Sequence, residues 1–384
     1  MEQLSGASQS SIQAPSATTV PKAAPGAPRL LFLFSHAIAD EAEKVASGIS
    51  PTERLYGAHE LRARGWNVAF SDSRFFGPFG RFLKFLRQFG VMGISAGTVV
   101  DMARSDVVVV KDDFSAITAI VARLLGKKLI FLDSMFALPQ RWWKTLGIWI
   151  SLRLAHETIC YSESQKKVWQ QRFGSTAERI RMLPYTIDVG FYRRHASEWQ
   201  PGRSSKLFAV GRDVGRDYAT LVKALRDTDF KLDLVTLPYL LRGLNVEGNA
   251  GIAVHQRLSY EDLFGLYREC AVVIIPLKAG GTEYPSGIRA MLESMVLRRP
   301  FIVTRSEVLQ EYMTEGLHGD MVPAGDSRAL REAIVASLER GEKSRAIVDA
   351  AARLVEEKYD VAVFADAFEA VLHRLVRPKS LASQ

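Results

Sequence analysis

The chain is poor in cysteine and has no long apolar run, and each shortage excludes a class of protein. It has two cysteines, Cys160 and Cys270, among 384 residues. Both lie in or beside apolar segments, so we expect buried free thiols in a reducing cytosol rather than a disulfide-stapled secreted fold. A membrane-spanning helix needs a run of about 18 or more apolar residues, and the sequence has none. Residues 1–27 also lack the apolar stretch of a secretion signal, and their Ser-, Ala- and Pro-rich composition predicts a disordered tail.

The rest of the composition is that of a globular protein with a basic surface. Hydrophobic residues make up 47% of the chain and charged residues 24%, which is typical of a soluble chain with a core. The length of 384 residues suits two domains of roughly 150–200 residues better than one. The net charge of +8 favours anionic partners such as phosphates, nucleic acid or an acidic membrane, unless it reflects only a generic basic surface.

Short apolar runs alternate with helical periods through most of the chain. Alternation of this kind with fully apolar strands predicts a parallel, doubly wound sheet. Near the start, Ser50 and Pro51 are expected to begin a helix, with Glu53 completing a capping box. The expected strands lie at 30–34, 67–70, 107–110, 129–132, 158–161 and 180–183, and after residue 205 at 206–210, 232–236, 272–275, 301–304 and 321–322.

The alternation is interrupted once, by the polar segment 188–205, which we interpret as a linker between two α/β domains. Two Rossmann-like doubly wound domains are therefore expected to face a cleft, where the carboxyl ends of their strands bind ligands. The last helix, expected at 361–376, is amphipathic and could pack on either domain. The expected division is a tail at 1–27, an N-terminal domain at 28–196, a C-terminal domain at 197–360 and a helix with a tail at 361–384.

The segment from Gly280 to Met295 carries a glycine-rich loop followed by a helix. Unpaired backbone N–H groups and the positive end of a helix make such a loop a site for phosphate. Glu293 lies further along the same helix, where it could face a ligand in the loop. The alternative is an ordinary ion pair with Arg289, four residues earlier, on an exposed helix face.

A second loop, after the strand at 206–210, carries Arg212 and Arg216 and ends at Asp217, a good helix N-cap. Two guanidinium groups beside the positive end of a helix suit a diphosphate, because arginine binds phosphate oxygens with two parallel hydrogen bonds. The alternative is that both arginines are surface residues paired with Asp213 and Asp217.

These motifs together resemble those of the retaining GT-B glycosyltransferases of family GT4, the glycosyl transferase group 1 family. The resemblance rests on the Gly211–Arg216 loop, on segment 280–304 and on the later Gly319-Asp-Met-Val-Pro-Ala-Gly-Asp326 motif. In the first half, segments 56–68 and 164–188 are similar to the corresponding family segments. The resemblance covers about residues 29–376 and implies a GT-B fold.

The resemblance also implies roles for individual residues. Arg212 and Arg216 would hold the donor diphosphate and Glu293 the donor ribose, and these are the residues that we assign to catalysis. The sugar-binding glutamate of the family is replaced by Pro285, which puts recognition of the donor sugar in doubt. The other implied contacts are Gly211, Glu283, Ser286, Gly287 and Ile288 on the donor side, with Asp112 and Asp133 on the acceptor side.

The implied activity is transfer of a sugar from a nucleotide-sugar donor to a saccharide, lipid-linked or other cell-envelope acceptor, with retention of configuration. The arginines and the helix end would stabilise the leaving diphosphate without a metal or cofactor. The alternatives are a nucleotide-sugar epimerase, which would need clustered histidines and carboxylates, and a non-catalytic GT-B scaffold. A nucleic-acid binder is disfavoured because the basic residues are dispersed.

Segment 74–89 combines aromatic and basic residues at helical spacing. Phe82, Phe85 and Phe89 fall on one face, with Arg81 and Lys84 off it, a pattern typical of a helix lying in a membrane interface. Segment 140–150 has a similar character. The protein is expected to be cytoplasmic. Either both helices pack on the sheet, or they make a peripheral contact with the anionic inner face of the plasma membrane.

Overall fold

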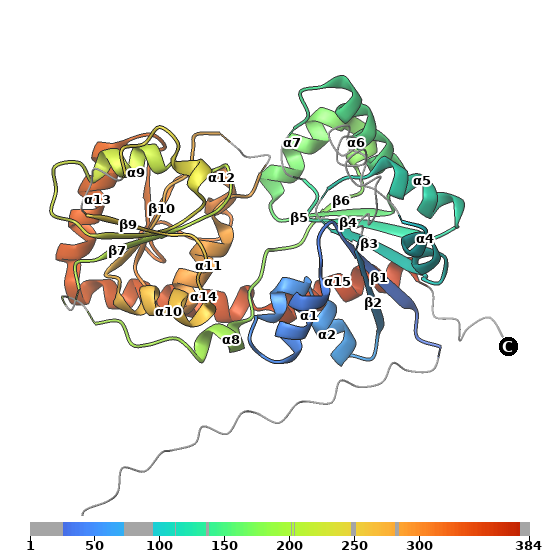
Figure 1. Cartoon of the computed structure of the whole chain (residues 1–384), viewed down its shortest axis with the longest axis horizontal. Helices are drawn as coiled ribbons and strands as arrows, with labels where there is room; N and C mark the ends of the chain where they lie inside the picture. Colours follow the sequence, from blue (N-terminus) through green and yellow to red (C-terminus); the bar gives the residue numbers. More distant parts are fainter. Residues whose placement is uncertain are drawn as a thin grey trace, which may run out of the picture.

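The computed structural model divides the chain into two α/β halves that lie side by side (Figure 1). Each half is built on a six-stranded sheet in which all neighbouring strands are parallel. The expected doubly wound, two-domain fold class is therefore confirmed. The structure describes residues 26–72, 95–111, 113–135, 138–200, 202, 204–246, 251–280 and 284–376.

The N-terminal sheet has the strand order β2-β1-β3-β4-β5-β6. Its strands are apolar and buried on both faces because helices cover both sides of the sheet. The strands are β1 (Arg29–Phe34), β2 (Asn67–Asp72), β3 (Val107–Lys111), β4 (Lys128–Leu132), β5 (Glu157–Cys160) and β6 (Ile180–Met182). The helical segments are α1 (Ala39–Ala46), η1 (Thr52–Leu55), α2 (Ala58–Ala63), α4 (Ala96–Ala103), α5 (Ala116–Leu124), α6 (Trp142–Leu154), α7 (Glu163–Phe173) and η2 (Gly174–Ala177).

The C-terminal sheet has the order β12-β11-β10-β7-β8-β9, and its chain reverses direction across the sheet between β7 and β10. The edge strand β9 and the helices α12 and α14 were not anticipated from the sequence. The strands are β7 (Leu207–Val210), β8 (Leu232–Val235), β9 (Ile252–His255), β10 (Val272–Ile275), β11 (Phe301–Thr304) and β12 (Asp320–Val322). The helical segments are α9 (Tyr218–Ala224), η3 (Pro238–Leu241), α10 (Tyr260–Glu269), α11 (Ile288–Val296), α12 (Glu307–Gln310), α13 (Ser327–Arg340), η4 (Gly341–Lys343) and α14 (Ser344–Lys358).

Side-chain caps fix where many of these helices begin. In each case a Ser or Asp oxygen accepts a hydrogen bond from a backbone N–H of the first turn, which would otherwise lack a partner. The capping residues are Ser95, Ser115, Ser162, Asp188, Asp217, Ser259, Ser306, Asp326 and Asp360.

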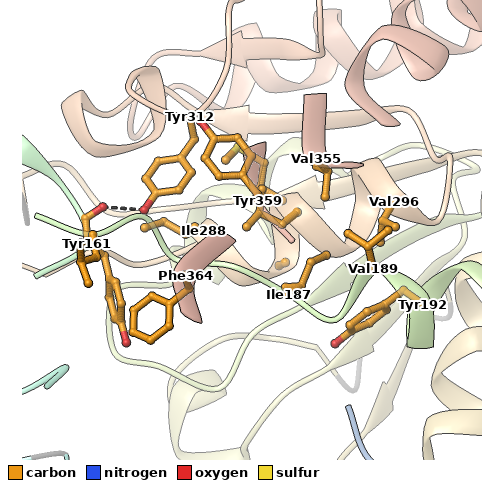
Figure 2. Packing of buried hydrophobic residues seen from close by; sticks show 14 of the residues in the cluster. Tyr161, Ile187, Val189, Tyr192, Ile288, Val296, Tyr312, Val355, Tyr359 and Phe364 are labelled. Atoms are coloured by element: carbon orange, nitrogen blue, oxygen red, sulfur yellow. Dashed lines mark hydrogen bonds between the residues drawn. The ribbon is translucent and has the colours of Figure 1, made fainter. Parts of the chain in front are cut away.

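The chain crosses between the halves twice, and the two crossings are hydrogen-bonded to each other. Ile187 donates its N–H to Tyr359 (2.9 Å) and accepts one from Val361 (2.9 Å). The first crossing leads into α8 (Val189–Arg193), whose apolar side chains are buried. The expected linker 188–205 is thus in part a packed helix. Figure 2 shows the buried side chains that pack around Ile187, Val189 and Tyr192. A further link comes from Tyr312 of the C-terminal half, which donates to the carbonyl of Tyr161 (2.5 Å).

The second crossing leads into α15 (Val361–Leu375), which returns to the N-terminal half (Figure 1). This helix packs against α2. Phe368 is fully buried and its ring lies 6.3 Å from that of Phe32 in β1. The question left open by the sequence is therefore settled in favour of the N-terminal half.

The expected capping box at Ser50 is wrong. The segment forms the short 3₁₀ turn η1, which is preceded by Pro51 and has no side-chain cap. The Glu53 carboxylate instead accepts the backbone N–H of Asp188 (3.0 Å), beside the first crossing. Glu53 is buried there, so a long-range contact has replaced the local one.

Both cysteines are free and buried, as expected. Among the residues that the structure describes, no helix combines the length and the apolar content needed to span a membrane.

Candidate active site

A cavity of about 930 Å³ lies between the two halves of the molecule. Its walls include Asp133, just after β4, and Gly211, just after β7. Both positions are at the carboxyl ends of parallel strands, the edge at which open α/β sheets bind their ligands. The cavity is therefore our candidate active site.

The predicted site residues that the structure describes all line this cavity. Two others, Glu283 and Asp112, lie outside the described residues, as does segment 74–89 with its predicted membrane contact. The roles assigned to all of these residues stay predictions. The predicted residues in the cavity wall are Gly211, Arg212, Arg216, Ser286, Gly287, Ile288, Glu293 and Asp133.

Asp213 ties the two predicted loops together. One of its oxygens accepts from the Oγ of Ser286 (2.6 Å) and from the N–H of Gly215 (3.0 Å). The other pairs with Nε of Arg216 at 2.9 Å. Burial opposes ionisation of Asp213, but the charge of Arg216 and these hydrogen bonds hold the pKa of Asp213 below its usual value. Asp217 caps α9, as predicted.

The Arg216 guanidinium is held on one side only. Arg216 is 6% exposed, and its Nη1 is buried without a hydrogen-bond partner among the described residues. A buried donor of this kind costs free energy unless a ligand or water accepts its hydrogen. Arg212, in contrast, is exposed at the cavity rim. The arrangement suits an anion that accepts from Arg216.

Gly211 leaves the space in which the Arg216 side chain lies. A Cβ atom at position 211 would overlap the guanidinium. We therefore expect Gly211→Ala to displace the guanidinium and to weaken nucleotide binding, with little loss of stability because a flexible side chain can move away. Calorimetric titration with nucleoside diphosphates and thermal unfolding would measure both effects. Gly265→Ala, where a Cβ meets nothing closer than 3.9 Å, is the control; equal nucleotide affinity of the two variants would contradict the expectation.

The second loop ends at Gly287, which has a left-handed backbone (φ 88°) and immediately precedes α11. An added Cβ would lie 3.1 Å from Leu277 and would also be strained in this conformation. Gly287 and Ile288 both line the cavity, so the N-terminal end of α11 borders it. No side chain caps this helix end, and its backbone N–H groups and positive partial charge are suited to an anion.

Glu293 of α11 is 4% exposed and lines the same cavity. Its Oε1 accepts from Nε of Arg289 (2.8 Å) and lies 3.0 Å from the hydroxyl of Tyr192. Its Oε2 accepts from the hydroxyl of Tyr267 (3.1 Å). The ion pair with Arg289 considered from the sequence is thus present, but its expected position on an exposed helix face is wrong.

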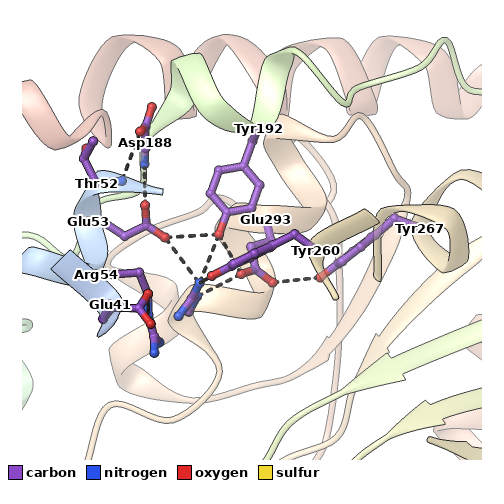
Figure 3. A network of polar contacts seen from close by, with 10 residues as sticks. Glu41, Thr52, Glu53, Arg54, Asp188, Tyr192, Tyr260, Tyr267 and Glu293 are labelled. Carbon is purple, nitrogen blue, oxygen red and sulfur yellow. Dashed lines mark hydrogen bonds and ion pairs between the residues drawn. The ribbon is translucent and has the colours of Figure 1, made fainter. Parts of the chain in front are cut away.

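The network around Glu293 includes a second carboxylate from the other half of the molecule (Figure 3). Glu53 of η1 lies 3.1 Å from the hydroxyl of Tyr192 and 3.3 Å from Nη2 of Arg289. Burial raises the pKa of Glu53 to about 7, although the nearby Arg289 charge and the Asp188 N–H oppose the rise. Glu53 therefore binds a proton near neutral pH.

Asp133 lies on the N-terminal side of the cavity and pairs with Lys111 at 3.1 Å. Its φ of 52° is unusual for a residue other than glycine. The Nζ of Lys111 also lies 4.4 Å from the ring centre of Tyr56. Positive φ at a polar cavity residue is a feature often found at functional sites.

Sequence reasoning missed three residues of the network around Glu293, namely Glu53, Tyr192 and Tyr260. Tyr260 accepts from Nη2 of Arg289 at 3.2 Å, and Tyr260 lines the cavity. Glu53 had a plausible local partner in the sequence, and the two tyrosines fit an apolar core. No local spacing indicates that three segments so far apart meet at Arg289.

Comparison with known proteins supports the expected fold. A sequence profile described as "Glycosyl transferases group 1" matches residues 216–340. A search of curated protein sequences gave no match.

Solved structures resemble the chain over most of its length. Anabaena HepE in complex with UDP and glucose has 16% identity and a TM-score of 0.67, covering 90% of this chain and 100% of its own. Sucrose-phosphate synthase from Thermosynechococcus elongatus has 15% identity and a TM-score of 0.67, covering 91% of this chain and 99% of its own. A glycosyltransferase from Rickettsia africae has 14% identity and a TM-score of 0.65, covering 92% of this chain and 100% of its own. Residues 216–340 are thus similar to the group 1 glycosyl transferases, and the chain as a whole has the GT-B fold.

Proposed function

We propose that the protein is a glycosyltransferase that moves a sugar from a nucleotide-sugar donor to an acceptor with retention of configuration. The proposal rests chiefly on the meeting of Arg216, the N-terminal end of α11 and Glu293 in one cavity between the halves. UDP is the first nucleotide to test, because Anabaena HepE was solved with UDP and glucose and also with UDP-glucose.

In this proposal Arg216 and the end of α11 bind the donor diphosphate, and Arg212 contacts it from the rim. Negative charge grows on the leaving diphosphate in the transition state, so positive groups already in place there lower the barrier. Arg216 is the principal candidate because its Nη1 is buried and has no hydrogen-bond partner among the described residues. The low dielectric of a buried site strengthens an ion pair. The acceptor hydroxyl would attack the same face of the sugar from which the diphosphate leaves.

Glu293 would bind the donor ribose. A carboxylate offers about four acceptor positions, and the three side-chain groups around Glu293 use at most three of them. One position is therefore left for a ribose hydroxyl. Arg289, Tyr192 and Tyr267 would hold the carboxylate in a fixed orientation, which lowers the entropy lost on binding.

A panel of nucleotide sugars tests the function. The protein is incubated with each one, with and without cell-envelope extract as acceptor, and the free nucleotide and the melting temperature are followed. Nucleotide release that depends on the extract supports the transferase. A changed sugar still attached to its nucleotide would identify an epimerase, and thermal protection without turnover would identify a non-catalytic scaffold.

We also propose that the acceptor is membrane-associated and that the enzyme contacts the membrane through α6. Trp142 and Trp149 on α6 are 73% and 44% exposed, and Leu146 between them is exposed too. The buried residues of α6 are Ser151 and Leu152, near its C-terminal end. Ile120 and Leu124 are exposed on the neighbouring α5.

The charges around this apolar surface favour an anionic membrane as its partner. Arg141, Lys144 and Arg153 are exposed on or beside α6, and residues 138–155 include no Asp or Glu. Each Lys or Arg near an anionic bilayer contributes about 1 kcal/mol, and Trp side chains favour the interface. A contact through 74–89 stays a prediction outside the described residues.

We expect wild-type protein to sediment with vesicles of phosphatidylcholine and phosphatidylglycerol, and the Trp142→Glu/Trp149→Glu variant to sediment several-fold less. The added carboxylates both oppose burial in the interface and repel the anionic lipid. Leu317→Glu, which changes an exposed leucine in the C-terminal half, is the matched control and should sediment like wild type. Equal sedimentation of a folded double-tryptophan variant would exclude α6 as the contact.

A further inference from the structure

The hydroxyl of Tyr192 lies between two carboxylates from different halves of the molecule (Figure 3). It is 3.1 Å from Oε1 of Glu53 and 3.0 Å from Oε1 of Glu293. Nη2 of Arg289 donates to it at 3.1 Å. The hydroxyl of Tyr192 is thus within hydrogen-bond distance of the other three groups.

With both carboxylates ionised, this arrangement has one hydrogen too few for each contact of Tyr192 to be a hydrogen bond. The hydroxyl of Tyr192 has a single hydrogen and can donate it to one carboxylate only. If Glu53 and Glu293 were both ionised, the oxygen of one would face a lone pair of the phenol at about 3 Å, which is repulsive. A proton on one carboxyl group converts that contact into a hydrogen bond.

The surroundings indicate that Glu53 holds this proton. Both oxygens of Glu293 already accept hydrogen bonds, Oε1 from Nε of Arg289 at 2.8 Å and Oε2 from the hydroxyl of Tyr267 at 3.1 Å. Glu53 receives the backbone N–H of Asp188 on Oε2 and only a longer contact of 3.3 Å from Arg289 on Oε1. Burial also raises the pKa of Glu53 to about 7.

The charged groups that face Glu53 act in both directions. Burial raises the pKa of Glu53 most, the charge of Arg289 lowers it, and the carboxylates of Glu293 and Asp188 raise it. The phenols that face the network have pKa values raised by burial, so they stay neutral as donors or acceptors; they are Tyr185, Tyr192, Tyr260 and Tyr267.

We propose that Glu53 is a positioning residue for the donor site, which in its neutral form donates to Tyr192 so that Tyr192 can donate to Glu293. The N-terminal half thereby fixes the orientation of the carboxylate that receives the ribose. Ionisation of Glu53 removes this donor and turns the hydroxyl of Tyr192 toward Glu53. This inference rests on the proposed nucleotide-sugar site, and it predicts that donor affinity falls as pH rises through 7.

The test is calorimetric titration of the full chain with UDP between pH 6 and pH 8.5, comparing wild type with Glu53→Gln. Glutamine cannot ionise, and its amide can donate to Tyr192 and accept from Asp188. It would lose the weak contact with Arg289, but the two hydrogens of Nη2 still have Tyr192 and Tyr260 as acceptors. We expect the ratio of wild-type to Glu53→Gln affinity for UDP to fall roughly three- to tenfold from pH 6 to pH 8.5. A change of this size corresponds to one weakened hydrogen bond.

Comparison with Glu53→Gln removes the titration of UDP itself, because that titration is common to both proteins. Glu157→Gln is the matched control: it changes another buried, arginine-paired glutamate of the N-terminal half and should keep the wild-type pH profile. Tyr192→Phe should weaken UDP binding at every pH. Unfolding measurements give a second readout. Because the pKa of Glu53 rises from 4.5 to about 7 on folding, its contribution to stability is complete below pH 4.5 and is lost as pH rises to about 7. The Glu53→Gln variant should show no such loss of stability.

The outcomes separate this inference from the proposed function. If wild-type protein binds no nucleotide in the panel at any pH, the proposed site is wrong and the inference falls with it. If wild type binds UDP and Glu53→Gln shows the same pH dependence, the positioning role of Glu53 is overturned while the site stands. A stable Tyr192→Phe variant with wild-type affinity would overturn it as well.

Discussion

Arg216→Ala is expected to weaken UDP binding by roughly 10- to 100-fold, the effect of losing a charge-assisted hydrogen bond worth about 1.5–3 kcal/mol. We expect so large a loss of affinity from a single arginine because its Nη1 is buried and has no hydrogen-bond partner among the described residues. Asp213 would keep its bonds from Ser286 and Gly215 after the substitution, so we expect only a modest loss of stability. Calorimetric titration and thermal unfolding measure the two quantities separately.

Two further variants make this prediction specific. Arg216→Lys retains the charge but loses the planar fork, so its affinity should fall between those of wild type and Arg216→Ala. Arg328→Ala removes an arginine of the same half that is almost fully exposed and paired with Glu332, and it should bind UDP like wild type. Unchanged affinity of a folded Arg216→Ala protein would sink the assignment of the diphosphate site.

Glu293→Gln is expected to lose both stability and donor binding. Breaking a buried ion pair leaves the remaining charge without its partner, at a cost that reaches about 3–5 kcal/mol. Arg289 keeps some compensation from Tyr192 and Tyr260, so the lower end of that range applies. The measurement is the free energy of unfolding in urea, together with the affinity for UDP.

A double variant separates these two effects of Glu293. In Arg289→Leu/Glu293→Leu both charges are removed, and replacement of a buried pair by apolar residues is often neutral or stabilising. We therefore expect the double variant to recover much of the lost stability without recovering UDP binding. A double variant that binds UDP as wild type does would show that Glu293 serves the fold alone and has no contact with the donor.

The sheets were predictable because their strands are locally distinctive. Segments such as 107–110 and 272–275 are continuous apolar runs, and a strand buried on both faces requires that composition. Strand β9 was missed because it lies at the sheet edge, where Ala253 and Val254 are exposed, so no buried run marks it. Helix α14 was missed because it follows α13 almost directly, with only the short turn η4 and no strand between the two helices.

In the candidate site too, some residues could be predicted from the sequence and others could not. Arg216 lies in a loop whose glycines, arginines and helix cap form one short motif, so its place at the cavity could be predicted. Glu53 could not be placed, because its partners Tyr192 and Arg289 are 139 and 236 residues away along the chain. A single sequence shows that a carboxylate is present but not which distant segment will desolvate it, and here the distant contact prevailed over a local capping box.

The return of α15 to the N-terminal half has a consequence for the order of folding during synthesis. The core of that half includes Phe364 and Phe368, which pack on residues near the start of the chain. The ribosome makes α15 after the whole of the C-terminal half, so the N-terminal sheet emerges first yet lacks part of its cover until α15 has been made. Residues 207–358 hold all the strands of the other sheet and can fold before them. We therefore expect the C-terminal half to form first and to serve as the surface on which the earlier-made half is completed.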